Sequence, residues 1–317
     1  MRRIEIVEVG PRDGLQNEPE VVPTRTKVEF INRLTGAGVR RLEASSFVNP
    51  KKVPQMADAE EVLKALPRRA DVVYIGLVLN RRGFERALAA GCGEIGMVVV
   101  ASDTFNQRNQ GVTTEQSVAA WIEIAAAARA AGVRTQVTLS SAFGCPFEGE
   151  IAPERVVDLA KRVAEGSPHE LALADTIGAA VPSQVADLVQ RVRQALPGMP
   201  LRCHFHNTRN TGLANAYAAL EAGVEVLDAS LGGIGGCPFA PAATGNIPTE
   251  DLVYMLERMG IETGLNLEAL IESSRWIQGE MGRPAPGMVV KAGPFPRPRT
   301  AAASREPYRQ SQSQNHH

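Results

Sequence analysis

Short runs of β-branched and other apolar residues alternate with longer segments whose apolar residues recur at helical spacing. This alternation constrains the fold more than any other feature of the chain. Eight runs are typical of strands, at residues 4–9, 41–44, 72–78, 94–101, 135–140, 170–174, 201–206 and 224–230. Helical patterns follow most of them, as in residues 26–35, 59–66, 114–131, 153–164, 183–196 and 213–222. Eight strands that alternate with helices predict an α/β fold with a closed parallel sheet, a (β/α)8 TIM barrel.

The length and the end of the chain suggest how this barrel is extended. An α/β barrel takes about 250 residues, and the chain has 317. We expect the catalytic barrel over residues 1–262, and a C-terminal helix and extension that packs on it over residues 263–294. Residues 295–317 are rich in Pro, Ala and polar residues and offer little to bury, so we expect a disordered tail there.

Composition excludes several functional classes. The formal net charge is -1, which does not favour a nucleic-acid partner. No stretch reaches roughly 18 unbroken apolar residues, so we expect no membrane partner. The N-terminus MRRIEIVEVG does not resemble a signal peptide, and the four cysteines form no CxxC pair. These features favour a reduced, cytoplasmic protein, and we expect a homodimer or a higher homo-oligomer.

Polar residues at predicted strand ends mark the site, because catalytic groups of this barrel lie at the C-terminal ends of its strands. His204 and His206 are two apart in the seventh strand and therefore project to the same side. Asp13 follows the first strand and Asn246 follows the eighth, which are near neighbours of the seventh in a closed barrel. Two imidazoles, a carboxylate and an amide oxygen suit Mg²⁺ or Mn²⁺, with Zn²⁺ as an alternative. Without those neighbours, two solvent-facing histidines would be the simpler interpretation.

Three further elements have both a catalytic and a structural interpretation. Arg12 suits stabilisation of an enolate oxygen, or it forms a salt bridge to Glu43, and the two are compatible. Cys237 ends a glycine run that is either a flexible surface loop or a mobile loop that carries a thiol over the barrel mouth. Asp175 follows the sixth strand, where it is either a catalytic carboxylate or a helix cap.

Five segments of the chain resemble the hydroxymethylglutaryl-CoA lyase family, in a match that runs from about residue 4 to residue 291. They are VEVGPRDGLQNE (7–18), EASSFVNPKKVPQMAD (43–58), GCPFEGEI (144–151), ADTIG (174–178) and GGIGGCPFAPAATGNIPTEDLVYML (232–256). The resemblance implies a TIM barrel, one divalent metal ion and an acyl-CoA substrate. It implies metal ligands at Asp13, His204, His206 and Asn246, and catalytic roles for Arg12, Glu43, Asp175, His204 and Cys237.

Two departures from the family pattern bear on the acyl group. Asn207 stands where the family usually has aspartate, and the fifth strand, with Gln136 and Thr138, lacks an arginine and a tyrosine of well-known members. We assign substrate binding to Arg12, Gln16, Gln136 and Thr138. The resemblance implies cleavage of 3-hydroxy-3-methylglutaryl-CoA to acetoacetate and acetyl-CoA. A lyase for a related acyl-CoA such as citramalyl-CoA, a condensing synthase and a metal-stabilised binding barrel stay as alternatives.

Overall fold

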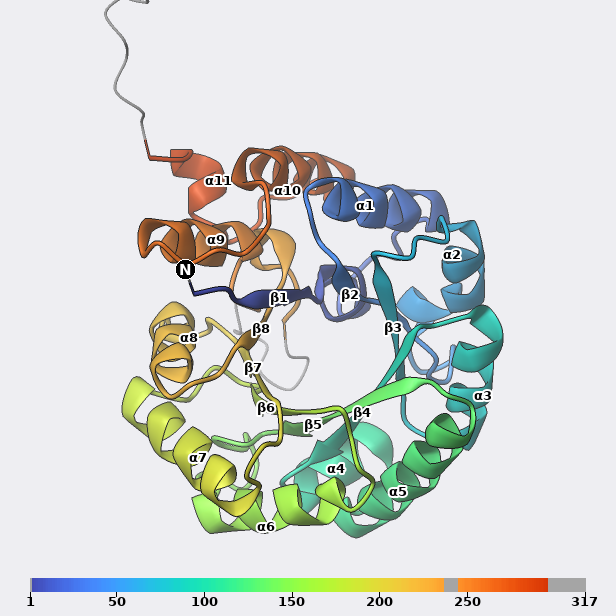
Figure 1. Cartoon of the computed structure of the whole chain (residues 1–317). Helices are drawn as coiled ribbons and strands as arrows, with labels where there is room; N and C mark the ends of the chain where they lie inside the picture. Colours follow the sequence, from blue (N-terminus) through green and yellow to red (C-terminus); the bar gives the residue numbers. More distant parts are fainter. Residues whose placement is uncertain (1, 237–244, 296–317) are drawn as a thin grey trace, which may run out of the picture.

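A computed structural model describes residues 2–236 and 245–295, and it confirms the predicted TIM barrel (Figure 1). Each strand pairs in parallel with the next, and β8 closes the ring against β1. The strands are β1 (Glu5–Glu8), β2 (Arg41–Ser46), β3 (Val73–Val78), β4 (Glu94–Val100), β5 (Arg134–Ser140), β6 (Glu170–Asp175), β7 (Leu201–Phe205) and β8 (Val226–Ala229).

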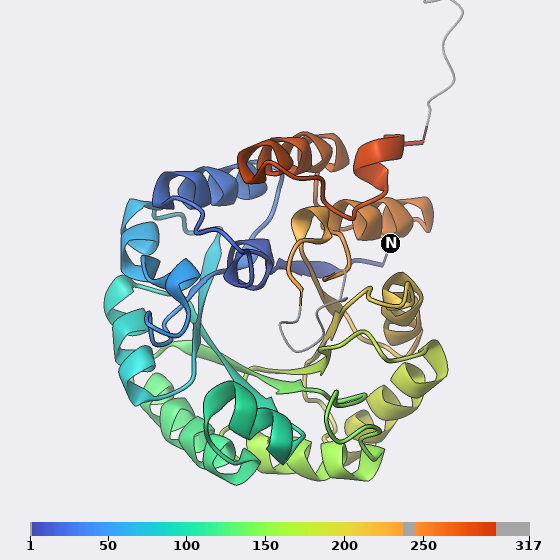
Figure 2. The same ribbon diagram turned by 180° about the vertical axis from the view of Figure 1, so that it is seen from behind.

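Helices surround the barrel, as both views show (Figures 1 and 2). The described helices are α1 (Thr24–Gly36), α2 (Ala59–Ala65), α3 (Arg81–Ala90), α4 (Asp103–Gln110), α5 (Thr114–Ala130), α6 (Pro153–Ala164), α7 (Pro182–Ala195), α8 (Gly212–Glu221), α9 (Thr249–Arg258), α10 (Leu267–Met281) and α11 (Val289–Ala292). A π-helical turn, η1 (Gly10–Gly14), follows β1, and short 3-10 turns lie at η2 (Pro54–Met56) and η3 (Leu231–Gly233). None of the helices in the described part of the chain is long and apolar enough to cross a membrane.

Local sequence signals explain where individual helices begin and end. Thr113 and Gln116 form a capping box at the start of α5. The Asn266 side chain caps α10, and Gly282 ends it in the left-handed conformation. The C-terminal helix expected within residues 263–294 is present as α10, which packs beside α1 and α9. Helix α4 has no apolar periodicity to predict it, because seven of its eight residues (DTFNQRNQ) are polar or charged.

The division of the chain into a barrel, an extension and a tail stays a prediction. The expected disordered tail lies almost wholly outside the described residues, which end at residue 295.

A buried ionic layer fills the barrel below its mouth. Arg41 donates to Glu94 and to both carboxylate oxygens of Glu170, at 3.0 and 2.9 Å for Glu170. Arg202 follows, with its Nε 3.4 Å from Glu170 Oε1 and 3.4 Å from Asp228 Oδ1. All five side chains are buried. Negative and positive side chains alternate from one contact to the next. Each charge is therefore compensated by a neighbour of opposite sign, which offsets the cost of removing these groups from water.

Candidate metal centre

Asp13, His204 and His206 lie together at the barrel mouth. A ligand atom of each lies within 4.8 Å of those of the other two. The η1 turn places Asp13 directly after β1, while His204 lies in β7 and His206 just beyond it. The two imidazole centroids are 5.1 Å apart, as expected for side chains that project from alternate positions of one strand.

Asn246 completes a four-residue set. Its backbone pairs with that of His206, and its Nδ2 donates to Asp13 Oδ2 at 2.8 Å and to the Ile234 carbonyl at 3.1 Å. Its Oδ1 and the Nδ1 of His206 are buried without a hydrogen-bond partner among the described residues. Buried polar atoms in proteins are nearly always paired. The other imidazole nitrogen of His206, Nε2, lies 3.9 Å from Asp13 Oδ2. Imidazole nitrogens, a carboxylate and an amide with an unpaired oxygen fit the coordination of a divalent cation.

His204 is oriented by a residue that the sequence pattern did not single out. Its Nδ1 lies 3.1 Å from Oδ2 of Asp228, a buried residue of β8. Burial lowers the pKa of His204, but the hydrogen bond and charge of Asp228, with the charges of Asp13 and Glu43, outweigh burial and raise it. The only sequence signal for Asp228 was a carboxylate within a mostly apolar predicted strand, residues 224–230, which also contains Glu225.

Arg12 bridges two carboxylates at the mouth. Its Nε donates to Glu43 Oε2 and its Nη1 to Asp13 Oδ1, each at 2.6 Å. The predicted salt bridge between Arg12 and Glu43 is therefore present, and the same guanidinium also contacts Asp13. Burial alone would raise the pKa of Asp13, but the charges of Arg12, His204 and His206 hold it well below its ordinary value. This lowered pKa suits Asp13 to metal binding, which requires an ionised carboxylate.

Asp175 stabilises the turn after β6 but does not cap a helix, because α7 begins at Pro182 with Val181 as its N-cap residue. Its two carboxylate oxygens accept from the backbone N–H groups of Ala179 and Ala180, at 2.9 and 3.0 Å. Burial nevertheless raises the pKa of Asp175 above its ordinary value, against these hydrogen bonds and the charges of His204 and Arg209.

The predicted substrate residues line two sides of the barrel. Gln16, which follows η1, accepts a hydrogen bond from the Ser46 hydroxyl at 3.2 Å. In β5, half-buried Thr138 donates to Oε1 of buried Gln136 at 3.3 Å. A Cβ at Gly96 would lie 2.3 Å from Gln136 Nε2, so the glycine makes room for this amide.

The glycine run after β8 passes directly against Asp13 and Asn246. Gly235 has φ +98°, and a Cβ there would lie 2.8 Å from the Asp13 carbonyl oxygen and 2.9 Å from Asn246 Nδ2. This segment is therefore not a loosely attached surface loop where it approaches the site. Cys237, predicted to be catalytic, lies outside the described residues.

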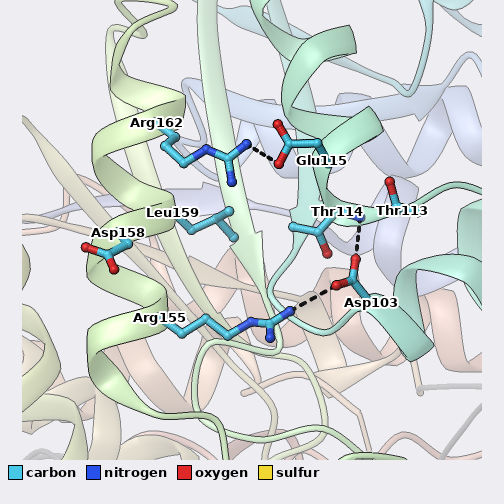
Figure 3. A pocket seen from close by; sticks show the side chains of 8 residues that line it. All are labelled: Asp103, Thr113, Thr114, Glu115, Arg155, Asp158, Leu159 and Arg162. Carbon is cyan, nitrogen blue, oxygen red and sulfur yellow. Dashed lines mark hydrogen bonds and ion pairs between the residues drawn. The ribbon is translucent and has the colours of Figure 1, made fainter.

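A separate hollow of about 660 Å³ lies between α5 and α6 on the outer ring (Figure 3). Two ion pairs cross it, Arg155–Asp103 and Arg162–Glu115, and the Thr114 N–H donates to Asp103 (Figure 3). These charged groups satisfy one another, so the hollow does not compete with the barrel mouth as a site.

Comparison with known proteins agrees with this geometry. The family model described as HMGL-like matches residues 3–277. The chain is 46% identical to an (R)-citramalyl-CoA lyase of Chloroflexus aurantiacus, over 93% of the chain and 96% of that protein. It is 43% identical to a hydroxymethylglutaryl-CoA lyase of Bacillus subtilis, over 90% and 95%.

A solved structure extends the agreement to three dimensions. An HMG-CoA lyase of Acinetobacter baumannii in complex with coenzyme A and 3-methylmalate superposes with a TM-score of 0.89 at 42% identity. The alignment covers 97% of this chain and 98% of that one. A family model across most of the chain, and relatives of this identity along nearly its whole length, establish that the protein belongs to the HMGL-like family.

Proposed function

We propose that the protein is a divalent-metal-dependent lyase that cleaves 3-hydroxy-3-methylglutaryl-CoA to acetoacetate and acetyl-CoA. The observation that carries this proposal is the Asp13, His204, His206 and Asn246 set with Arg12 held against it. Family relatives with hydroxymethylglutaryl-CoA lyase activity in their names support the reaction class. The related structure with coenzyme A supports an acyl-CoA substrate.

Asp13, His204, His206 and Asn246 would hold the metal ion, Mg²⁺ or Mn²⁺. When bound, it polarises the tertiary hydroxyl of the substrate and a neighbouring oxygen, which is worth several kcal/mol of charge stabilisation. The hydroxyl loses its proton, the bond between C2 and C3 breaks, and C3 becomes the ketone of acetoacetate. The electron pair of that bond passes to the acetyl-CoA fragment as an enolate.

The chain's own residues stabilise this charge and move the two protons. Arg12, fixed by Glu43 and Asp13, donates to the enolate oxygen as charge develops there. We assign removal of the hydroxyl proton to Asp175, which the family resemblance places at a catalytic position and whose pKa is raised by burial. His204 has Nδ1 engaged with Asp228 and uses Nε2 as a ligand, so we assign protonation of the enolate carbon to Cys237.

Citramalyl-CoA is the second candidate substrate, and its cleavage gives pyruvate and acetyl-CoA. The relative from Chloroflexus aurantiacus favours it, because that protein is an (R)-citramalyl-CoA lyase at 46% identity. The two substrates share the tertiary hydroxyl and the thioester, and their carboxylates differ in position by one methylene. A methylene changes binding by about 1–3 kcal/mol, whereas an unpaired carboxylate changes it far more.

The test uses purified protein stripped of metal and then supplied with Mg²⁺ or Mn²⁺. Each acyl-CoA is added separately, and acetyl-CoA is measured together with acetoacetate or pyruvate. We expect cleavage of hydroxymethylglutaryl-CoA that depends on the ion. Cleavage of citramalyl-CoA alone would show that citramalyl-CoA, and not hydroxymethylglutaryl-CoA, is the substrate. Condensation of acetyl-CoA with a keto acid would favour a synthase. Ion binding without any acyl-CoA product would leave only a metal-stabilised binding barrel.

Thr138→Tyr tests whether β5 selects the acyl group. Thr138 is half-buried within β5, so a bulky ring there would fill space available to the far carboxylate. We expect the ratio of kcat/KM for the two substrates to change by about tenfold or more, which corresponds to about 1.4 kcal/mol. An equal change for both substrates would show that β5 does not read the acyl group.

A further inference from the structure

Asp228 connects the metal centre to the ionic layer of the barrel. One carboxylate oxygen, Oδ2, lies 3.1 Å from His204 Nδ1, and the other, Oδ1, lies 3.4 Å from Arg202 Nε. The strands β7 and β8 are neighbours whose register pairs Cys203 with Leu227, which places Asp228 opposite His204 one residue later. Asp228 is 3% exposed and Arg202 is 0% exposed, so bulk solvent does not screen these contacts.

The position of Asp228 decides which nitrogen of His204 is free. A carboxylate only accepts hydrogen bonds, so the ring proton of neutral His204 lies on Nδ1. The lone pair of Nε2 is then available to a cation. His206, by contrast, has no hydrogen-bond partner at Nδ1 among the described residues. Carboxylates that fix a histidine in this way orient it and raise its strength as a metal ligand.

Arg202 in turn compensates the charge of Asp228. Its Nε lies equally far from Asp228 and Glu170, and Glu170 is held by two hydrogen bonds from Arg41. A buried carboxylate without such a cation costs several kcal/mol. The ionic layer thus favours the charged form of Asp228.

We propose that Asp228 and Arg202 are positioning residues that hold His204 in the tautomer with its proton on Nδ1. They thereby set the affinity of the centre for its divalent ion. This inference rests on the proposed metal site. It adds two residues to that site that do not touch the ion, and it assigns a role to an ionic layer that the reaction itself does not use.

Asp228→Asn tests the role of the carboxylate with Mn²⁺ as the probe. The amide can donate to Nδ1, and this moves the ring proton to Nε2, where it blocks the ion. We expect Mn²⁺ affinity, measured by calorimetry on enzyme without substrate, to fall about 10–100-fold. In ¹⁵N-histidine spectra of the metal-free protein, which has five histidines, we expect the proton of His204 to move from Nδ1 to Nε2.

Asp251→Asn is the matched control. Asp251 is also a buried carboxylate, but it accepts from the N–H groups of Met288 and Val289 at the start of α11. We expect Mn²⁺ affinity to be unchanged. Asp228→Glu keeps the charge and displaces the carboxylate by one methylene, so it should also weaken Mn²⁺ binding. If Asp228→Asn does not fold, Asp228→Glu is the variant that tests the inference.

Arg202→Met tests whether the arginine acts through Asp228. We expect the single variant to weaken Mn²⁺ binding, and the double variant with Asp228→Asn to bind no more weakly than Asp228→Asn alone. Additive losses would refute action through Asp228. Unchanged affinity and tautomer in Asp228→Asn, with tight binding by the wild type, would overturn the inference and leave the metal site intact. A wild type that binds no Mn²⁺ would instead overturn the proposed metal site.

Discussion

Single residues at the barrel mouth combine structural and chemical roles. Arg12 forms the salt bridge to Glu43 and also lies against Asp13, so neither of its two interpretations excludes the other. Glu8 has a comparable double position, because its Oε1 accepts from Gly10 N at 2.8 Å and from Leu231 N at 2.9 Å. This one carboxylate therefore ties the turn that carries Asp13 to the loop that leads to Asn246.

We predict that Arg12→Lys lowers kcat at least tenfold while the protein stays folded. Lysine keeps the charge but cannot donate to Glu43 and Asp13 with the fixed geometry of a guanidinium. Steady-state kinetics and far-UV circular dichroism measure the two properties. Arg86→Lys is the control, because Arg86 makes a similar two-point contact with Glu60 on the outer helices. A tenfold change in kcat corresponds to about 1.36 kcal/mol of activation free energy. A kcat within about threefold of wild type is a smaller effect and would show that Arg12 is only structural.

The buried carboxyl of Glu8 should make stability depend on pH. Burial raises its pKa to about 7, against the hydrogen bonds from Thr249, Leu231 and Gly10. The folded state therefore holds a proton that the unfolded state, with a pKa near 4.5, releases between pH 4.5 and 7. The stabilising contribution is complete below pH 4.5 and is lost as the pH rises through about 7.

Glu8→Gln should remove this loss, because the amide resembles the protonated acid. We expect the free energy of unfolding of the variant, relative to wild type, to rise by roughly 3 kcal/mol from pH 4.5 to pH 8, at 1.36 kcal/mol per pKa unit. Urea unfolding at both pH values measures it. Glu61→Gln, on the exposed side of α2, is a control for the loss of a carboxylate. A difference from wild type that stays constant with pH would contradict the prediction.

At the scale of elements, the segment after α10 supports the loop at the mouth. Gly287 N donates to the Gly232 carbonyl at 2.9 Å, and Arg283 forms an ion pair with Glu18, which follows η1. Glu250, at the start of α9, accepts from Gly232 N at 2.9 Å. The C-terminal extension is thus attached to the same loop that approaches Asp13.

Gly287→Ala should destabilise the protein, because a Cβ there would lie 2.7 Å from Glu250 Oε1 and 3.3 Å from the Gly232 carbonyl oxygen. We expect a loss of about 1–3 kcal/mol in the free energy of unfolding, typical of overpacking. Gly279→Ala is the matched control, since it lies within α10 with nothing within 4 Å of its Cβ. It should stabilise by about 0.5–1 kcal/mol. Equal effects of the two substitutions in urea unfolding would contradict a tight contact at Gly287.

At the scale of the whole molecule, ion binding should stabilise the fold. The proposed ligands lie far apart in the sequence, so only the folded chain brings them together. At one hundred times the dissociation constant, an ion that binds only the folded state adds about 2.7 kcal/mol. We expect Mn²⁺ to give this increase in wild type and in His169→Ala, whose exposed ring accepts from Thr135 N away from the site. His206→Ala should lose it. Chelation that left both activity and stability unchanged would contradict a metal-dependent enzyme.

The sequence predicted what local spacing encodes and missed what distant pairing creates. The alternation of strands and helices predicted the barrel, and the spacing of His204 and His206 predicted a shared side. Asp228 and Arg202 acquire their roles from contacts across neighbouring strands, which no local pattern specifies. Glu8 likewise depends on a partner 223 residues away. The expected homo-oligomer stays a prediction.

Strand β7 makes the centre unusually sensitive to changes in chain length. Arg202 and His204 point into the barrel, while Cys203 and Phe205 between and beside them pack in the outer apolar core. Side chains of a strand alternate with a period of two, so one inserted residue would turn every later side chain to the opposite face. An in-frame insertion of a single codon here would bury an imidazole among helices and expose a phenyl ring to the mouth, whatever residue that codon encodes.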